Sequence, residues 1–153
     1  RMPEPEVKLD NLSKTLKNSF ELFAQSYTKI NMKLTLPEKD VIFQFDNFQI
    51  TQALNNLIKN AVEAVSTIPN PSIIVELFDF NKNIQISIMD NGIGIDENKI
   101  TKLFEPYYTT KDKGTGLGLS IVKKIIEDHG GIIKIEKNKN MTGTKSLINF
   151  ELE

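Results

Sequence analysis

The chain has 153 residues, enough for one domain with its own hydrophobic core. Its 19 basic and 20 acidic residues nearly cancel, so no strong overall field favours nucleic acid or anionic lipid. Cysteine is absent, which excludes disulfides and thiolate metal sites, and no apolar run approaches the roughly 18 residues of a membrane span.

The first half of the sequence predicts two helices and two short strands. Residues 1–8 are rich in proline and charge, and we expect them to be a linker from an upstream domain of a longer protein, with one domain over 9–153. Apolar residues at helical spacing predict a helix from Leu9 to about Gln25. Strands are expected over 32–36 and 41–45, and a second helix, capped by Asp46 or Asn47, to about Ser66.

The second half predicts a hairpin, a long loop, a third helix and two closing strands. The hairpin covers 72–80 and 84–89, the helix 117–128 with a glycine stop at 130–131, and the last strands 132–136 and 146–152. This order indicates an α+β fold: a two-layer sandwich with three helices on one face of a mixed, mostly antiparallel sheet. The irregular segment, about 93–116, is longer than most loops, so we expect it to be a lid over a binding site.

The glycines mark where this site lies. All eight fall between Gly92 and Gly143, and the cluster at Gly114, Gly116 and Gly118 leads directly into the third helix. A glycine-rich loop before a helix N-terminus is suited to binding phosphate. The spacing fits neither the Walker A nor the Rossmann dinucleotide motif.

Five groups of residues follow one another along the chain. They are Asn56-Leu57-Ile58-Lys59-Asn60, Asp90-x-Gly92-x-Gly94, Leu103-Phe104-Glu105-Pro106 followed by Thr109-Thr110-Lys111, Gly114-Thr115-Gly116-Leu117-Gly118, and Gly143-Thr144. Taken in this order, they resemble the N, G1, F, G2 and G3 boxes of the catalytic domain of sensor histidine kinases, the GHKL or Bergerat ATP-binding fold shared with gyrase and MutL. The residues around Asn60 look most like the nitrogen-regulation branch (NtrB and NtrY).

The chemistry of these residues agrees with an ATP site. Asp90 can accept a hydrogen bond from the adenine amine, whereas guanine presents a carbonyl there; a bond of this kind contributes roughly 1.5–3 kcal/mol. Asn60 offers a neutral oxygen to Mg²⁺, and Lys111 offers a charge to the terminal phosphate. By resemblance, Thr144 helps hold the adenine edge. Further nucleotide contacts are expected from Gly92, Gly94, Phe104, Gly114, Thr115, Gly116, Leu117 and Gly118.

Several of these residues also have ordinary structural readings. Asp90-Asn91-Gly92 could be a simple turn, Phe104 core packing at the base of the lid, and Lys111 a solvated charge. His129, the one histidine, is expected to be a structural contact at a helix end rather than a phosphate acceptor.

Asn56 bears on the reaction. ATPase relatives carry a water-activating glutamate at this position, and an amide cannot take a proton from water as a carboxylate does. Transfer to a protein is therefore expected over rapid hydrolysis. The resemblance implies an acceptor histidine on a separate dimerisation domain of the same protein, followed by a response regulator. It also implies that this fragment is cytoplasmic, and it is compatible with a parent protein anchored in the inner membrane.

Two alternatives remain at this stage. One is a serine kinase of the anti-sigma-factor type, and the other is a nucleotide-sensing module without transfer activity. The sequence also departs from the family pattern twice: Glu63 stands where several subfamilies have lysine, and Ser146 stands where phenylalanine is expected after Thr144.

Overall fold

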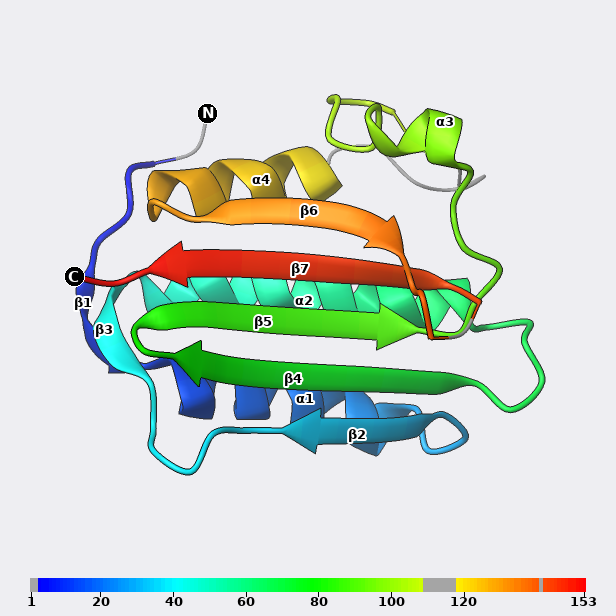
Figure 1. Ribbon diagram of the computed structural model, residues 1–153, viewed down its shortest axis with the longest axis horizontal. Coiled ribbons are helices and arrows are strands. Elements are labelled where there is room, and N and C mark those ends of the chain that lie inside the picture. Colours follow the sequence, from blue (N-terminus) through cyan, green and yellow to red (C-terminus); the bar gives the residue numbers. More distant parts are fainter. Residues whose placement is uncertain (1–2, 109–117, 141) are drawn as a thin grey trace.

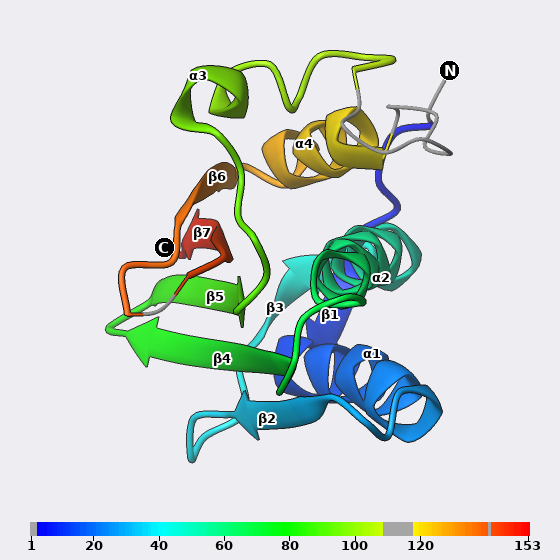
Figure 2. The same cartoon turned by 90° about the vertical axis from the view of Figure 1, so that its right-hand side faces the viewer.

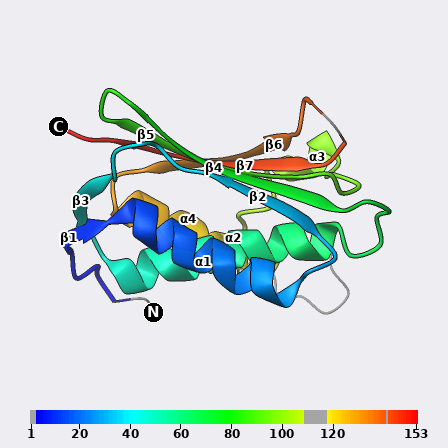
Figure 3. The same cartoon turned by 90° about the horizontal axis from the view of Figure 1, so that it is seen from below.

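The computed structural model describes residues 3–108, 118–140 and 142–153. Three long helices cover one face of a five-stranded sheet (Figures 1 and 3). In chain order the elements are β1 (Lys8–Asn11), α1 (Leu12–Ser26), β2 (Asn31–Thr35), β3 (Ile42–Phe45), α2 (Asn47–Ala64), β4 (Ser72–Phe80), β5 (Asn83–Asp90), α3 (Glu97–Ile100), α4 (Gly118–Asp128), β6 (Ile132–Lys137) and β7 (Thr144–Glu151).

The sheet is mixed and mostly antiparallel, as the sequence predicts. Its strand order is β2-β4-β5-β7-β6, and only the β2–β4 pair is parallel. The turn between β4 and β5 places Asn81 and Lys82 at φ 55° and 71°, the left-handed geometry that tight hairpins favour. This order puts the end of β5 next to the start of β7, which becomes important at the site.

The core lies between the sheet and the helices α1, α2 and α4. Alternate residues of β4 point inward and are fully buried, and α2 contributes an apolar stripe that packs against them. Burial of each large aliphatic side chain stabilises the fold by about 1.5–3 kcal/mol. The inward-facing residues of this interface include Ile73, Val75, Leu77, Leu54, Leu57 and Ile58.

The first helix begins later than its apolar spacing predicts. Residues Lys8–Asn11 form β1, which pairs antiparallel with β3, and Leu9 is 66% exposed rather than buried on a helical face. The helix begins at Leu12 because the Asn11 side chain accepts a hydrogen bond from Lys14 N and caps it. The expected start at Leu9 is therefore wrong.

The segment after β5 is also more regular than expected. A single helical turn, α3, interrupts it, with Asp96 as the N-cap (Figure 1).

Asp46 caps α2 and is one of the two residues predicted for that role. Within the described ranges, no helix combines the length and apolarity that a membrane crossing needs.

His129 joins the ends of two helices. Its Nδ1 lies 2.7 Å from the carbonyl oxygen of Ile125 in α4, and its Nε2 accepts a hydrogen bond from Asp46 N, the cap of α2, at 3.1 Å. This geometry uses a neutral imidazole protonated at Nδ1. Gly130, at φ 75°, then ends α4 in the predicted glycine stop, with Gly131 N donating to Ile126 O. His129 is a structural contact, as expected.

The chain before β1 is fastened to the same corner. Glu6 N donates to Asp46 Oδ2 at 2.8 Å, and the side-chain amide of Gln49 donates to Pro3 O at 3.1 Å. Burial acts to raise the pKa of Asp46, but hydrogen bonds from Gln49 N and Glu6 N outweigh it, so the pKa lies below its usual value. This corner is at the end of α2 opposite the candidate site.

Candidate functional site

A buried carboxylate stands at the end of β5. Asp90 is 5% exposed, and its Oδ1 accepts hydrogen bonds from Gly92 N at 2.9 Å and Thr144 N at 3.3 Å. Burial raises the pKa of Asp90, and these two hydrogen bonds partly oppose that rise. Because both donors reach the same oxygen, the carboxylate is held in one orientation.

The turn between β6 and β7 presses directly on Asp90. A Cβ at Gly143 would lie 2.0 Å from the Asp90 carbonyl oxygen, and the residue has φ 122°, so only glycine fits. This close approach brings Thr144 N–H to the carboxylate. The predicted grouping of Asp90, Gly92 and Thr144 is therefore present, although Asp90 and Thr144 are 54 positions apart.

One face of α2 connects this carboxylate to the start of α4. Asn56, Asn60 and Ala64 are four residues apart and share that face. Next to its C-terminal end lies Gly92, where a Cβ would be 2.5 Å from Ala64 O; next to Asn56 lies Gly118, where a Cβ would be 2.9 Å from the amide group. The face is about 12 Å long at 1.5 Å per residue, which makes the site elongated. Figure 2 looks nearly along α2 and shows this helix between α4 and α1.

The two asparagines are themselves in contact. Asn60 Nδ2 donates to Asn56 Oδ1 at 3.4 Å, and both side chains are half-buried. This bond directs the carbonyl of Asn56 toward Asn60, although both the oxygen and the nitrogen of the Asn56 amide would lie 2.9 Å from a Cβ at Gly118. Five of the predicted site residues cannot be placed against this face, because they lie outside the described residues: Lys111, Gly114, Thr115, Gly116 and Leu117.

The described part of the segment after β5 packs on the body of the domain. Phe104 is half-buried against the core, with Lys123 Nζ 5.9 Å from its ring centroid. This agrees with the packing reading of Phe104. Glu97 of α3 forms an exposed ion pair with Lys137 of β6 at 3.4 Å.

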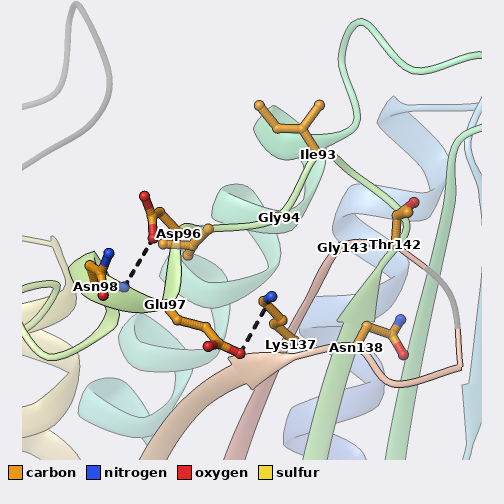
Figure 4. Close-up of a pocket in the computed structure, with 10 residues that line it drawn as sticks. Ile93, Gly94, Asp96, Glu97, Asn98, Lys137, Asn138, Thr142 and Gly143 are labelled. Carbon is orange, nitrogen blue, oxygen red and sulfur yellow. Dashed lines mark hydrogen bonds and ion pairs between the residues drawn. The ribbon is translucent and has the colours of Figure 1, made fainter.

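An open, polar cleft of about 470 Å³ lies beside the carboxylate (Figure 4). The segment after β5 and the β6–β7 turn form its walls. It shares Gly94 and Gly143 with the candidate site, but neither Asp90 nor the α2 asparagines line it. The cleft is thus a neighbour of the site rather than its centre.

The described residues hold no cluster of three or more acidic, histidine or cysteine side chains that would bind a metal alone. A divalent cation here would need ligand phosphates and water in addition to the amide oxygen of Asn60. Magnesium is commonly bound in this way, so the donor set fits it.

Sequence reasoning missed one residue at this site. Asn138, just after β6, is 5% exposed, and its Nδ2 donates to Asp90 O at 3.1 Å. No motif marks it, and its burial in a polar turn is visible only in three dimensions.

Comparison with known proteins places this site in a family. Residues 45–153 match the family described as "Histidine kinase-, DNA gyrase B-, and HSP90-like ATPase", and the chain belongs to it. Within this family the class is the catalytic, ATP-binding domain of sensor histidine kinases, as the sequence motifs predict.

Individual relatives agree. The chain is 36% identical over 140 residues to the nitrogen regulation protein NtrY of Azorhizobium caulinodans, covering 88% of this chain and 18% of that protein. The nucleotide-free catalytic domain of histidine kinase ThkA has a TM-score of 0.84 at 34% identity, covering 95% of this chain and 97% of that one. A structure of ThkA with the response regulator TrrA has a TM-score of 0.80 at 29% identity, covering 95% and 42%. The chain thus spans less than a fifth of the NtrY relative.

Proposed function

We propose that this chain binds Mg–ATP and positions its γ-phosphate for transfer to a histidine on a separate dimerisation domain of the same protein. The observation that carries the proposal is the buried Asp90 carboxylate, fixed through Oδ1 by two backbone N–H groups. Its Oδ2 accepts from the exocyclic amine of adenine. Residues 9–153 form the catalytic domain, 93–116 its lid, and 1–8 the incoming linker.

The phosphates extend from Asp90 along α2 toward α4. Gly118 begins α4, whose N-terminal dipole favours an anion there, and Asn60 supplies an oxygen to Mg²⁺. Magnesium provides charge neutralisation on the phosphates. Lys111 meets the terminal phosphate, and the lid backbone closes over the nucleotide through Gly114, Thr115, Gly116 and Leu117. Gly92, Gly94 and Thr144 line the adenine end, and Phe104 supports the lid.

Asn56 favours transfer over hydrolysis. It lies against the start of α4, at the phosphate end of the α2 face, where a general base for water would act. An amide has no proton-accepting group of suitable basicity, so activated water is disfavoured. Positioning of ATP, metal and acceptor then accounts for catalysis.

The partners follow from this reaction. The first is the histidine-bearing domain, and the second a response regulator that takes the phosphate from it. The ThkA–TrrA complex, a relative bound to a response regulator, supports the second partner. Because the substrate is ATP, we place the domain in the cytoplasm, and this placement is compatible with a parent protein anchored in the inner membrane through other segments.

Titration of ATP and GTP, with and without Mg²⁺, tests the binding site. We expect ATP to bind more tightly than GTP, and Asp90→Asn to weaken ATP by about one to two orders of magnitude, since the exchange loses a bond to a charged acceptor. Asp40→Asn, an exposed carboxylate between β2 and β3, is the matched control and should bind as wild type. Asn60→Asp should change chiefly the Mg²⁺ dependence. Equal affinity for both nucleotides refutes the role of Asp90.

Transfer is tested separately, by mixing the chain with the histidine-bearing fragment of its parent and labelled ATP. Acid-labile phosphohistidine is the expected product. Phosphoserine on a partner would instead indicate a kinase of the anti-sigma-factor type. Tight ATP binding without any transfer would indicate a nucleotide-sensing module.

A further inference from the structure

Asn138 is a buried polar residue at the hinge between β6 and the β6–β7 turn. Its side-chain amide donates to Asp90 O at 3.1 Å, its side-chain oxygen accepts from Asn140 N at 3.3 Å, and its backbone N–H donates to Gly143 O at 3.1 Å. Two of these hydrogen bonds hold the β6–β7 turn together, and the third attaches the turn to the end of β5.

The hydrogen bond from Asn138 to Asp90 extends the β5–β7 hydrogen-bond ladder beyond the point where the two strands stop pairing. At this end of the sheet the last paired residues of β5 and β7 are Met89 and Lys145. Asp90 lies one residue beyond them, so its carbonyl needs another donor. Asn138 supplies that donor from its side chain. A buried carbonyl left without a donor destabilises the fold, which explains why a polar residue is buried here.

This attachment determines where the Thr144 N–H lies. The turn approaches Asp90 so closely that Gly143 has no room for a Cβ, and Thr144 N then reaches Asp90 Oδ1 at 3.3 Å. Gly92 N donates to the same oxygen at 2.9 Å. If the turn moves away, one of the two donors that orient the carboxylate is lost.

We propose that Asn138 is a positioning residue that sets the orientation of the Asp90 carboxylate and thereby the preference of the site for adenine. This inference rests on the proposed role of Asp90 in binding the base. Asn138 need not contact the nucleotide. It acts through the β6–β7 turn and the Thr144 N–H.

A positioning role and a purely structural role have different signatures. Loss of orientation at Asp90 weakens the binding of ATP, whose adenine amine uses the carboxylate. It does not weaken the binding of GTP, whose guanine presents a carbonyl at that position. The ATP-to-GTP affinity ratio should then fall about ten-fold. Loss of the Thr144 donor also leaves ionised Asp90 less stabilised, so this side chain takes up a proton more readily. As pH is lowered, the variant should therefore lose ATP binding at a higher pH than wild type does.

The test compares Asn138→Ala and Asn138→Leu with the control Asn140→Ala, all in this chain. The leucine variant keeps the size of the side chain but lacks the Nδ2 donor and adds no charge beside Asp90, and it carries the test if the alanine variant does not fold. Asn140 is exposed and takes part through its backbone, so its side chain is dispensable. ATP and GTP affinities are measured by calorimetry between about pH 5 and pH 8, with a urea titration to verify folding.

The outcomes separate this inference from the proposed function. A positioning role is supported if the Asn138 variants show a lower ATP-to-GTP affinity ratio and lose ATP binding at a higher pH on acidification, while Asn140→Ala shows neither change. Equal weakening of both nucleotides, or an unchanged ratio, overturns it while the role of Asp90 stands, provided that Asp90→Asn abolishes the preference. If wild type does not distinguish ATP from GTP, the role of Asp90 fails and this inference fails with it.

Discussion

Gly143→Ala measures how closely the β6–β7 turn must approach Asp90. The new Cβ would lie 2.0 Å from Asp90 O, whereas carbon and oxygen rarely approach within about 3.3 Å, so the turn must move by about 1 Å. The residue also has φ 122°, a conformation that costs a non-glycine residue about 1–3 kcal/mol. Displacement breaks the bonds from Asn138 N to Gly143 O and from Thr144 N to Asp90 Oδ1, at about 1 kcal/mol each. The expected loss of unfolding free energy is therefore about 3–5 kcal/mol.

Gly130→Ala is the matched control for this variant. Gly130 also has positive φ, 75°, but nothing lies within 4 Å of its added Cβ. It should lose only the backbone term, about 1–2 kcal/mol, and bind ATP as wild type. Urea denaturation measures the first quantity and calorimetry the second, in which Gly143→Ala should weaken ATP about ten-fold or more. An equal loss of stability in the two variants, with ATP affinity retained in both, refutes the contact at Asp90.

Three further predictions follow from the geometry. Asp90→Asn should raise the unfolding free energy at neutral pH while it weakens the binding of ATP. Burial raises the pKa of Asp90, so ionisation of this side chain destabilises the folded state: the destabilisation is absent below the ordinary pKa of 3.8 and grows as pH rises through the folded pKa. Paired urea titrations should therefore show a more stable variant at neutral pH and no difference in acid. His129→Ala loses two hydrogen bonds, about 2 kcal/mol of unfolding free energy, which should lower Tm by about 4–8 °C. ATP affinity should not change, because the site is at the other end of α2. An unchanged melting curve contradicts the role of His129 in connecting the ends of α2 and α4. Asn56→Glu supplies a base near the phosphates and should raise the rate of phosphate release from ATP at least about ten-fold. A rate of phosphate release equal to that of wild type contradicts this role of position 56.

The wild-type carboxylate thus trades stability for binding. Asp90 is buried at the end of an apolar strand, where ionisation is unfavourable in the folded state. An asparagine would keep an oxygen for both backbone donors and avoid the buried charge. The chain retains the acid, which is expected where a charged acceptor is needed for a ligand.

Much of the fold was predictable because its determinants are local. Alternating apolar residues define β4 and β5, the helical stripe defines α2, and Asp46 and Gly130 mark helix ends. The motif order placed the carboxylate at the end of a strand and the asparagines on one helical face. Two short elements were missed, β1 and α3, because four residues carry too little periodicity to distinguish strand, helix and loop.

The sequence by itself determined the class of fold, the family and the residue types at the site, since these depend on spacing within segments and on the order of those segments along the chain. The tertiary structure alone decided how the site is assembled. Asp90 meets Thr144 and Asn138 across 54 and 48 positions, and Asp46 meets His129 across 83. These contacts depend on the strand order β5-β7-β6 and on the missing side chain of Gly143, which together bring the last turn of the sheet onto the carboxylate. No periodicity encodes that approach, because it is a property of how the strands pack rather than of any one of them.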